Sequence, residues 1–318
     1  MTDVARVPAS VEVDAPITAL LNEIEALRLL PRTAARQQAL DTARSRVTPL
    51  RQEVYSRLTP WQRVLVARHP KRPRTRDYLS RLCSEFTELH GDRRFGDDPG
   101  VVAGFARFGG EPVLVVGHQR PHPGHAGGAR PEGYRKALRC MRLAEKVGRP
   151  IITFVDSVGS SPDVGSEARG MADAIAHTLR EMTMLAVPVI VVVIGESSGG
   201  TALALAVGDY VLMLEYAVYS VLGAEHGATM LWGDATRTED SADALKLTAS
   251  DLVRLGVIDE VVPEPPGGAH ADPVAATELL MEPLRSALRD QASLAANARV
   301  SERHARLGRL GLSGVAGT

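Results

Sequence analysis

The stretch VVIGESSGGTALALAVGD, residues 192–209, contains the turn that decides the fold of this chain. It continues the apolar run VPVIVVVI and leads into an apolar helix-like run, so it predicts a strand, a turn and a helix. The turn Gly195-Glu196-Ser197-Ser198-Gly199 fits the G-x-S-x-G pattern of a serine-hydrolase elbow, with Ser197 as nucleophile. The same glycines would also expose backbone N–H groups at a helix N-terminus, where they attract an anionic oxygen. The turn alone leaves both alternatives open, a nucleophilic serine and an oxyanion cradle.

Apolar strands alternate with helical patterns on both sides of this turn. Residues 101–119 form a hairpin pattern around Gly109-Gly110, and residues 131–148 form a helical pattern that ends at Gly148. The run PIITFVDS predicts a second buried strand, and DYVLMLEYAVYSVLG (209–223) predicts a third extended run. This alternation predicts an α/β core whose strands are buried on both faces.

The ends of the chain have different patterns. Apolar spacing predicts helices over 17–30, 33–57 and 75–90, with a further helix capped by Thr59-Pro60, and helical structure over 273–318. We therefore expect four regions: a disordered leader (1–15), an N-terminal helical arm (16–90), the main domain (91–290), and a C-terminal helix and tail (291–318).

Composition excludes several classes of function. The 318 residues carry 37 basic and 38 acidic side chains, a balance that gives no electrostatic case for binding nucleic acid or a membrane. The two cysteines, Cys83 and Cys140, are too few for a four-Cys zinc site or a disulfide framework. Neither a signal peptide nor a membrane span is recognisable, so we expect a cytoplasmic protein. His118, His122 and His125 stand in or beside a glycine-rich loop without acidic ligands, and we expect no metal there.

A second strand-to-loop junction, Asp156-Ser157-Val158-Gly159-Ser160-Ser161-Pro162, is similar to the first. Two such junctions side by side would make an oxyanion hole from backbone amides. The hydrolase alternative needs a base and an acid downstream of Ser197. The chain offers these for the two roles: His226 and His270, and Asp209, Asp251 and Asp259.

Several segments, in order, resemble the carboxyltransferase α subunit of bacterial acetyl-CoA carboxylase over about residues 15–290. They include TPWQRVLVARHPKRPRTRDYL, ELHGDRRFGDD, GHQ, PEGYRKALRCMRLAEK, PIITFVDSVG, REMTMLAVPVIVVVIGE and VIDEVVPEPPGGAHADP. The resemblance implies a crotonase-like (ClpP/crotonase) fold, a spiral of ββα units with an N-terminal helical arm.

The resemblance also implies a reaction and its partners. A carboxyl group would pass from carboxybiotin on a carrier protein to acetyl-CoA or a related acyl-CoA, giving malonyl-CoA. The partners would be a β subunit with a zinc ribbon, in an α2β2 assembly, and the biotin carboxyl carrier protein. The α chain would hold the biotin and the β chain the CoA thioester. Two alternatives stay open: a standalone decarboxylase or hydrolase of a malonyl-type thioester, and a non-catalytic structural subunit.

The site residues follow from the same resemblance. The catalytic backbone positions would be Gly199, Gly200, Thr201, Val158, Gly159 and Ser160. The positions against the cofactor would be Glu196, Ser197, Ser198, Ser161 and Pro162, and no residue would bind a metal.

Both loops depart from the family pattern. The family's G-E-G-G-S-G-G-A falls on residues 195–202, so the G-x-S-x-G match arises from two Gly-to-Ser differences. The second glycine of its Gly-Gly pair falls on Thr201, which would be strained if that position needs a positive φ. Val158, Ser161 and Asp163 replace the family's proline, tyrosine and glycine. These differences predict a specialised paralogue.

Overall fold

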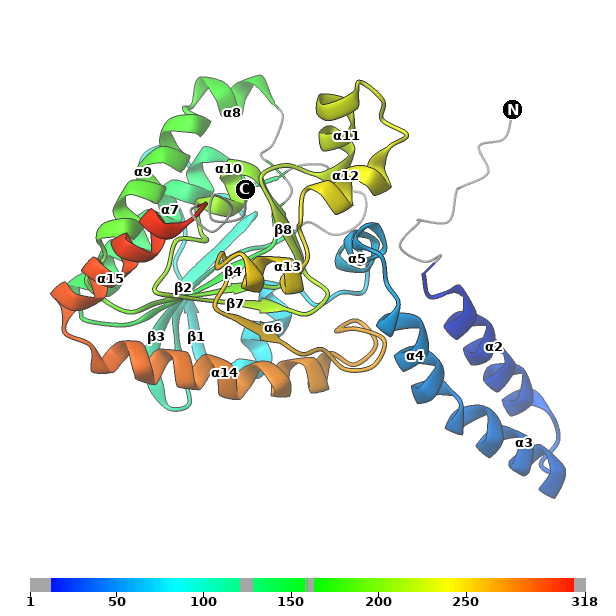
Figure 1. The fold of residues 1–318 in the computed structure, drawn as a ribbon. Coiled ribbons are helices and arrows are strands. Elements are labelled where there is room, and N and C mark those ends of the chain that lie inside the picture. Colours follow the sequence, from blue (N-terminus) through cyan, green and yellow to red (C-terminus); the bar gives the residue numbers. More distant parts are fainter. Residues whose placement is uncertain (1–12, 121–127, 158, 160–162, 312–318) are drawn as a thin grey trace.

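A seven-stranded sheet forms the centre of the molecule in the computed structural model, which describes residues 13–120, 128–157, 159 and 163–311 (Figure 1). The strand order is β1-β2-β3-β4-β5-β7-β9. The first two pairings, β1–β2 and β2–β3, are antiparallel, and the others are parallel. The strands of this sheet are β1 (Cys83–Glu88), β2 (Val101–Phe108), β3 (Glu111–His118), β4 (Ile151–Val155), β5 (Val189–Val193), β7 (Tyr210–Leu214) and β9 (Glu260–Val262).

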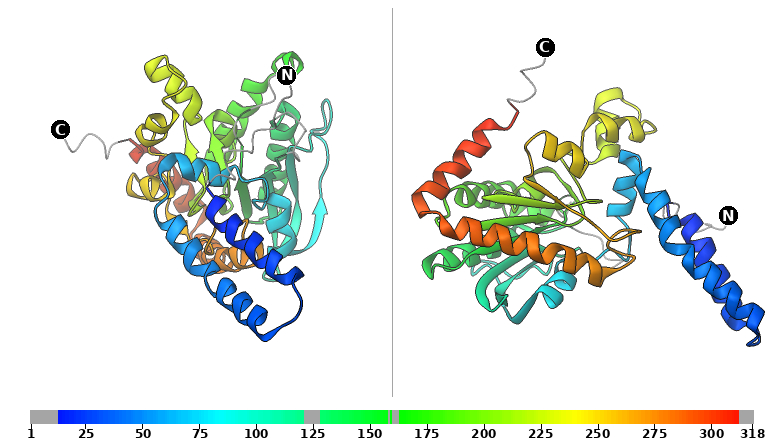
Figure 2. Two further views of the ribbon diagram at one scale, coloured as in Figure 1. Left: turned by 90° about the vertical axis from the view of Figure 1, so that its right-hand side faces the viewer. Right: turned by 60° about the horizontal axis from the view of Figure 1, so that its bottom comes forward.

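The central strands are buried on both faces. Every residue of β4 and β5 is buried, which suits their composition of Val, Ile and Phe with a single Thr153, whose hydroxyl donates to the Leu205 carbonyl at 2.8 Å. On one face, α7 (Pro131–Lys146) packs on β2, β3 and α9 (Met171–Met184). On the other, α6 (Thr75–Leu82) and α14 (Pro273–Ser293) cover the sheet (Figures 1 and 2). The predicted α/β core is confirmed.

A small second sheet lies at the carboxyl edge of the first. It pairs β6 (Glu196–Ser198) with β8 (Val218–Ser220) in parallel. Of the short helices, α10 (Gly199–Leu203) contacts β6 and α13 (Ala249–Arg254) contacts β8. The others are α8 (Val164–Ala168), which packs on α9, and α11 (Ala224–Trp232) and α12 (Thr238–Ala244), which pack on each other. The C-terminal helix is α15 (Ala296–Arg309).

Three helices project from the sheet as an arm (Figures 1 and 2). They are α2 (Ala15–Leu29), α3 (Ala34–Ser45) and α4 (Val47–Ser56). Leu20, Ile24, Leu40 and Ala43 form their own buried cluster. α5 (Pro60–Ala67) then joins the arm to the core, and Thr59 caps it through a capping box with Gln62, as the Thr-Pro pair predicts.

Several sequence-based boundaries are wrong. The helix expected over 75–90 ends at Leu82, and residues 83–88 are β1, because pairing with β2 outweighs local helix preference. The helix expected over 33–57 divides at Arg46, and that over 273–318 at Leu294 and Ala295. The third extended run is two strands, β7 and β8, which belong to different sheets. Most of the expected leader, residues 1–12, lies outside the described residues.

Within the described ranges, no helix is both long enough and apolar enough to cross a lipid bilayer.

Candidate functional site

The two strand-to-loop junctions meet at the carboxyl edge of the sheet. β4 and β5 are parallel neighbours, so the loops after them leave the sheet side by side. The Ile194 amide donates to the Val155 carbonyl at 3.0 Å, and the Ser198 amide donates to the Ser157 carbonyl at 2.8 Å. We call this pair of turns, built from Gly159 and residues 195–201, the glycine cradle. Its two halves are adjacent, as the sequence predicts.

The glycine cradle needs glycine at particular positions. Gly199 has φ +69° and Gly159 has φ +144°, conformations that side chains rarely adopt. Gly199 begins α10, and the first amides of a helix lack an intrahelical acceptor. Among the described residues, a Cβ on Gly200 would meet only Ile175 Cγ2, at 3.7 Å, and a Cβ on Gly159 would meet nothing within 4 Å. The backbone is therefore approachable from outside.

The expected strain at Thr201 is wrong. Among the described non-glycine residues only Glu85, Arg93 and Lys246 have a positive φ, so Thr201 has none. Thr201 lies within α10, and its hydroxyl donates to the Ser198 carbonyl at 3.2 Å. The positive φ falls on Gly199 instead. Val158, Ser160, Ser161 and Pro162 lie outside the described residues.

A buried carboxylate lies beneath the glycine cradle. A Cβ on Gly195 would lie 2.3 Å from Asp156 Oδ1, so Gly195 permits this close approach. Arg120 Nε donates to Asp156 Oδ2 at 2.8 Å, whereas Oδ1 has no hydrogen-bond partner among the described residues. Burial raises the pKa of Asp156, although Arg120 and Arg72 oppose that rise. Asp156 therefore connects the end of β4 to the start of the second turn.

A buried hydrogen-bond chain links the elements around the glycine cradle. Tyr134 Oη, on α7, donates to the Thr201 carbonyl at 3.1 Å. His118 Nε2, at the end of β3, lies 3.2 Å from Tyr134 Oη, and the Asp156 amide faces His118 Nδ1 at 3.4 Å. Burial lowers the pKa of His118 to about 3, so the ring is neutral. Sequence reasoning missed this role, although both residues stand in the quoted segments GHQ and PEGYRKALRCMRLAEK.

We expect Tyr134→Phe to lower the free energy of unfolding by about 1 to 3 kcal/mol, because it removes the buried hydrogen bond from Tyr134 Oη to the Thr201 carbonyl and the contact of Oη with His118 Nε2. Urea unfolding measures this change. The matched control is Tyr219→Phe, since Tyr219 Oη has no hydrogen bond among the described residues. Equal stability of both variants would contradict the chain.

The residues of the hydrolase alternative do not meet. Ser197 lies in β6 opposite Tyr219, is 1% exposed, and its Oγ has no partner among the residues described. His226 is exposed on α11, and His270 stacks on His69. The three acids have other partners: Asp209 binds Arg303, Asp251 binds Thr248, and Asp259 binds Arg306. Ser197 therefore has neither the elbow geometry nor the base of a hydrolase.

The Glu196 carboxylate faces a cation. Arg68, which follows α5, donates from Nε and Nη2 to both Glu196 oxygens at 2.6 and 2.7 Å. Glu196 is 5% exposed, so its carboxylate pairs with Arg68 and is not accessible to a ligand.

One group of possible metal ligands occurs in the described part of the chain: Asp14, His69 and His270. Their ligand atoms lie within 4.8 Å of one another. The two imidazole rings stack with centroids 3.8 Å apart, and His270 Nε2 lies 3.0 Å from Asp14 Oδ2. Tyr55 Oη donates to Asp14 Oδ1 at 2.8 Å. His69 Nε2 faces the same Asp14 Oδ2 atom, at 3.8 Å. We therefore interpret the group as a hydrogen-bonded contact between the N-terminal segment and the loop before α14.

Acidification should destabilise the fold through buried neutral histidines. Burial lowers the pKa of His69 to about 4 and that of His118 to about 3, from an ordinary value of 6.5. At a pH between the lowered and the ordinary pKa, the unfolded chain binds more protons than the folded chain does. The free energy of unfolding therefore falls as the pH falls. We expect a loss of roughly 1 to 2 kcal/mol per histidine between pH 7 and pH 5, measured by urea unfolding. A fold as stable at pH 5 as at pH 7 would contradict the prediction.

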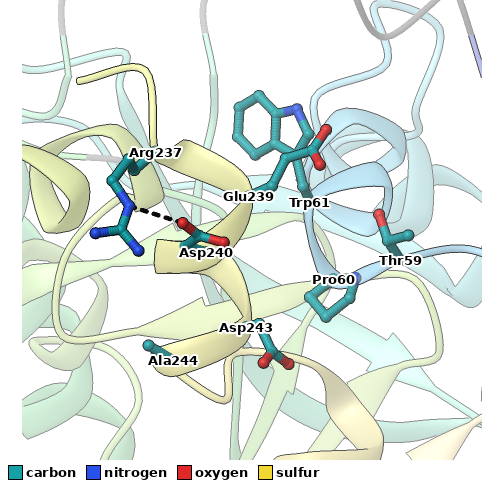
Figure 3. A pocket seen from close by; sticks show the side chains of 8 residues that line it. All are labelled: Thr59, Pro60, Trp61, Arg237, Glu239, Asp240, Asp243 and Ala244. Carbon is teal, nitrogen blue, oxygen red and sulfur yellow. Dashed lines mark hydrogen bonds and ion pairs between the residues drawn. The ribbon is translucent and has the colours of Figure 1, made fainter. Parts of the chain in front are cut away.

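A cavity of about 450 Å³ lies apart from the glycine cradle, between α5 and α12 (Figure 3). Trp61, Glu239, Asp240 and Asp243 are among its lining residues, and Arg237 Nε donates to Asp240 at 2.8 Å. No residue of either glycine turn lines it, so it does not extend the site.

Comparison with known proteins agrees with this geometry. Residues 10–311 match the family model "Acetyl co-enzyme A carboxylase carboxyltransferase-like". The chain is 52% identical over 265 residues to the acetyl-coenzyme A carboxylase carboxyl transferase subunit alpha of Geobacter sulfurreducens, covering 81% of this chain and 83% of that one. It is 44% identical to the protein of the same name from Geobacillus thermodenitrificans over 311 residues, covering 95% of this chain and 96% of that one.

Solved structures share the fold. Transcarboxylase 12S superposes with a TM-score of 0.60 at 23% identity, covering 72% of this chain and 44% of that chain. A Pseudomonas malonate decarboxylase hetero-tetramer gives a TM-score of 0.55 at 17% identity, covering 70% of this chain and 91% of that chain. The crotonase-like α/β fold is confirmed. With the family model and the relatives, these matches establish that the chain belongs to the family of acetyl-CoA carboxylase carboxyltransferase α subunits.

Proposed function

We infer that the chain is the carboxyltransferase α component of an acetyl-CoA carboxylase, which carries a carboxyl group to acetyl-CoA and gives malonyl-CoA. The main support for this function is the glycine cradle, found in a chain that belongs to this family. Gly199 and Gly159 hold conformations that leave the backbone open to a ligand oxygen.

The fit to a biotin ring is favourable. The residues present an approachable backbone at Gly159, Gly199, Gly200 and Thr201, and a Cβ at two of these positions would require strain. When bound, carboxybiotin supplies the carboxyl group. The chain's own part is to direct backbone amides at the negative charge that develops on the ureido oxygen, in the manner of an oxyanion hole. The buried chain from His118 through Tyr134 to Thr201 keeps these amides in place.

The partners follow from this function. We propose a β-type subunit with a zinc ribbon that holds the CoA thioester, a biotin carboxyl carrier protein, and an α2β2 assembly working in the cytoplasm. Residues 16–90 would act as the arm, and residues 91–290 as the carboxyltransferase domain.

The test is the reverse reaction. The pure chain is mixed with the zinc-ribbon β-type subunit, biotin and malonyl-CoA, and acetyl-CoA release is measured with each component omitted in turn. Release that needs both subunits and biotin supports the proposal. Release by the chain alone without biotin would indicate a standalone decarboxylase or hydrolase. No release in any mixture would indicate another acyl-CoA or a structural subunit.

A further inference from the structure

One guanidinium holds two carboxylates beside the glycine cradle. Arg68 binds both oxygens of Glu196, and it also donates from Nη1 to Glu225 Oε1 at 2.5 Å and from Nη2 to Glu225 Oε2 at 2.9 Å. Both pairs are therefore bidentate, a geometry that arginine forms and lysine does not.

The two carboxylates belong to opposite sides of the site. Glu196 begins β6, three residues before Gly199, and Glu225 lies in the first turn of α11. β6 and β8 pair through Ser198 and Ser220, and the Val221 carbonyl oxygen lies 3.6 Å from a Cβ built on Gly199. The start of α11 therefore lies beside the glycine turn, and Arg68 spans the two.

The surroundings strengthen this contact. The Glu196 side chain is 6% exposed and that of Arg68 is 31% exposed, so water screens the pair less than it screens a surface ion pair. The Trp61 ring lies against Arg68, with its centroid 5.4 Å from Cζ. Hydrogen bonds from Arg68 lower the pKa of Glu225, so this carboxylate stays charged near neutral pH.

Arg68 also changes the electrostatic charge beside the glycine cradle. Nearby negative charge weakens the binding of an anionic oxygen to backbone amides. Two carboxylates, those of Glu196 and Glu225, lie beside the glycine cradle. Arg68 neutralises one of these charges and separates the two carboxylates. Without it, they would repel each other and open the gap between β6 and α11.

We propose that Arg68 is a positioning residue for carboxyl transfer, fixing the distance between the glycine turn and α11 and offsetting the charge of Glu196 and Glu225. This inference rests on the proposed function of the glycine cradle. Arg68 acts through these two carboxylates and not on the reacting atoms.

The experiment compares Arg68→Met, Arg68→Lys and Glu225→Gln in the reverse assay with the β-type subunit. We expect Arg68→Met to lower kcat about 10- to 100-fold with KM for malonyl-CoA within twofold, because small misplacements of a site cost about this much. Arg68→Lys should fall between Arg68→Met and the unaltered chain, since it keeps the charge but loses the bidentate contacts. Glu225→Gln frees only the α11 side. The matched control is Arg57→Met, which removes an exposed arginine paired with Glu53 at the end of a neighbouring helix.

Amide hydrogen exchange gives a readout independent of activity. Arg68→Met should speed exchange in both 196–198 and 224–232, whereas Glu225→Gln should speed it in 224–232 alone. Unchanged kcat and exchange in Arg68→Met and Glu225→Gln would overturn the inference while leaving the proposed function intact. If the unaltered chain is inactive in the assay, the proposed function fails, and the exchange data alone still decide whether Arg68 holds the two elements together.

Discussion

Gly200→Val is expected to lower kcat for carboxyl transfer by about 10²- to 10³-fold, the cost of losing one oxyanion-hole donor. Gly200 lies in the first turn of α10, and within the described part of the chain a Cβ there contacts only Ile175, at 3.7 Å. A valine should therefore fold, but its branched methyls would stand over the amides that a ligand must reach. The measurements are kcat in the reverse assay and the thermal midpoint of the purified variant.

Two companion variants sharpen this test. Gly200→Ala adds only the Cβ and should lose much less activity. Gly308→Val places the same side chain in α15, where a Cβ meets nothing within 4 Å, and controls for the cost of valine in a helix. Unaltered turnover in Gly200→Val would remove Gly200 from the glycine cradle.

Arg72→Met should produce the largest loss of stability, about 3 to 5 kcal/mol, because it leaves the Glu264 carboxylate buried and unpaired. Both side chains are fully buried, and Arg72 donates to the two Glu264 oxygens at 2.9 and 2.6 Å. Arg72 Nε also donates to the Ile194 carbonyl at 2.8 Å, directly before the second glycine turn. Unfolding in urea, followed by circular dichroism, measures the loss.

The control for this variant is Arg76→Met. Arg76 pairs with Glu88 at the surface, with its own side chain 49% exposed, so its removal should cost less than about 1 kcal/mol. The double variant Arg72→Met with Glu264→Gln should be less destabilised than the sum of its parts, since the uncompensated charge is gone. Equal losses for Arg72→Met and Arg76→Met would show that the buried pair contributes no more than a surface pair.

Much of the fold could be predicted because local pattern and burial agree. The runs of β4 and β5 are apolar except at Thr153, a pattern typical of strands buried on both faces, and the structure buries every one of these residues. β1 is the opposite case. Its sequence CSEFTE is polar and half exposed, and it is a strand because β2 offers a partner edge. A single sequence does not show such a pairing.

The candidate site, like the fold, could be predicted only in part. The glycine turns were found because they follow recognisable strands, and the structure joins them through the Ser198 amide and Ser157 carbonyl. His118, Tyr134 and Arg68 were missed as site residues because their partners are distant in sequence. Tyr134 contacts a residue 67 positions away, and Arg68 contacts one 128 positions away. The signal that could have found them was their presence inside the segments that carry the family resemblance.

The contact between Asp14 and His270 has a consequence for the order in which the chain assembles. These residues are 256 positions apart. At a synthesis rate of 5 to 20 residues per second, His270 leaves the ribosome on the order of 13 to 50 seconds after Asp14. Through that interval Asp14 and Tyr55 can bond to each other, but both lack their contact with His270. The arm can form its own helices early, but its full set of contacts with the core is complete only after His270 has left the ribosome.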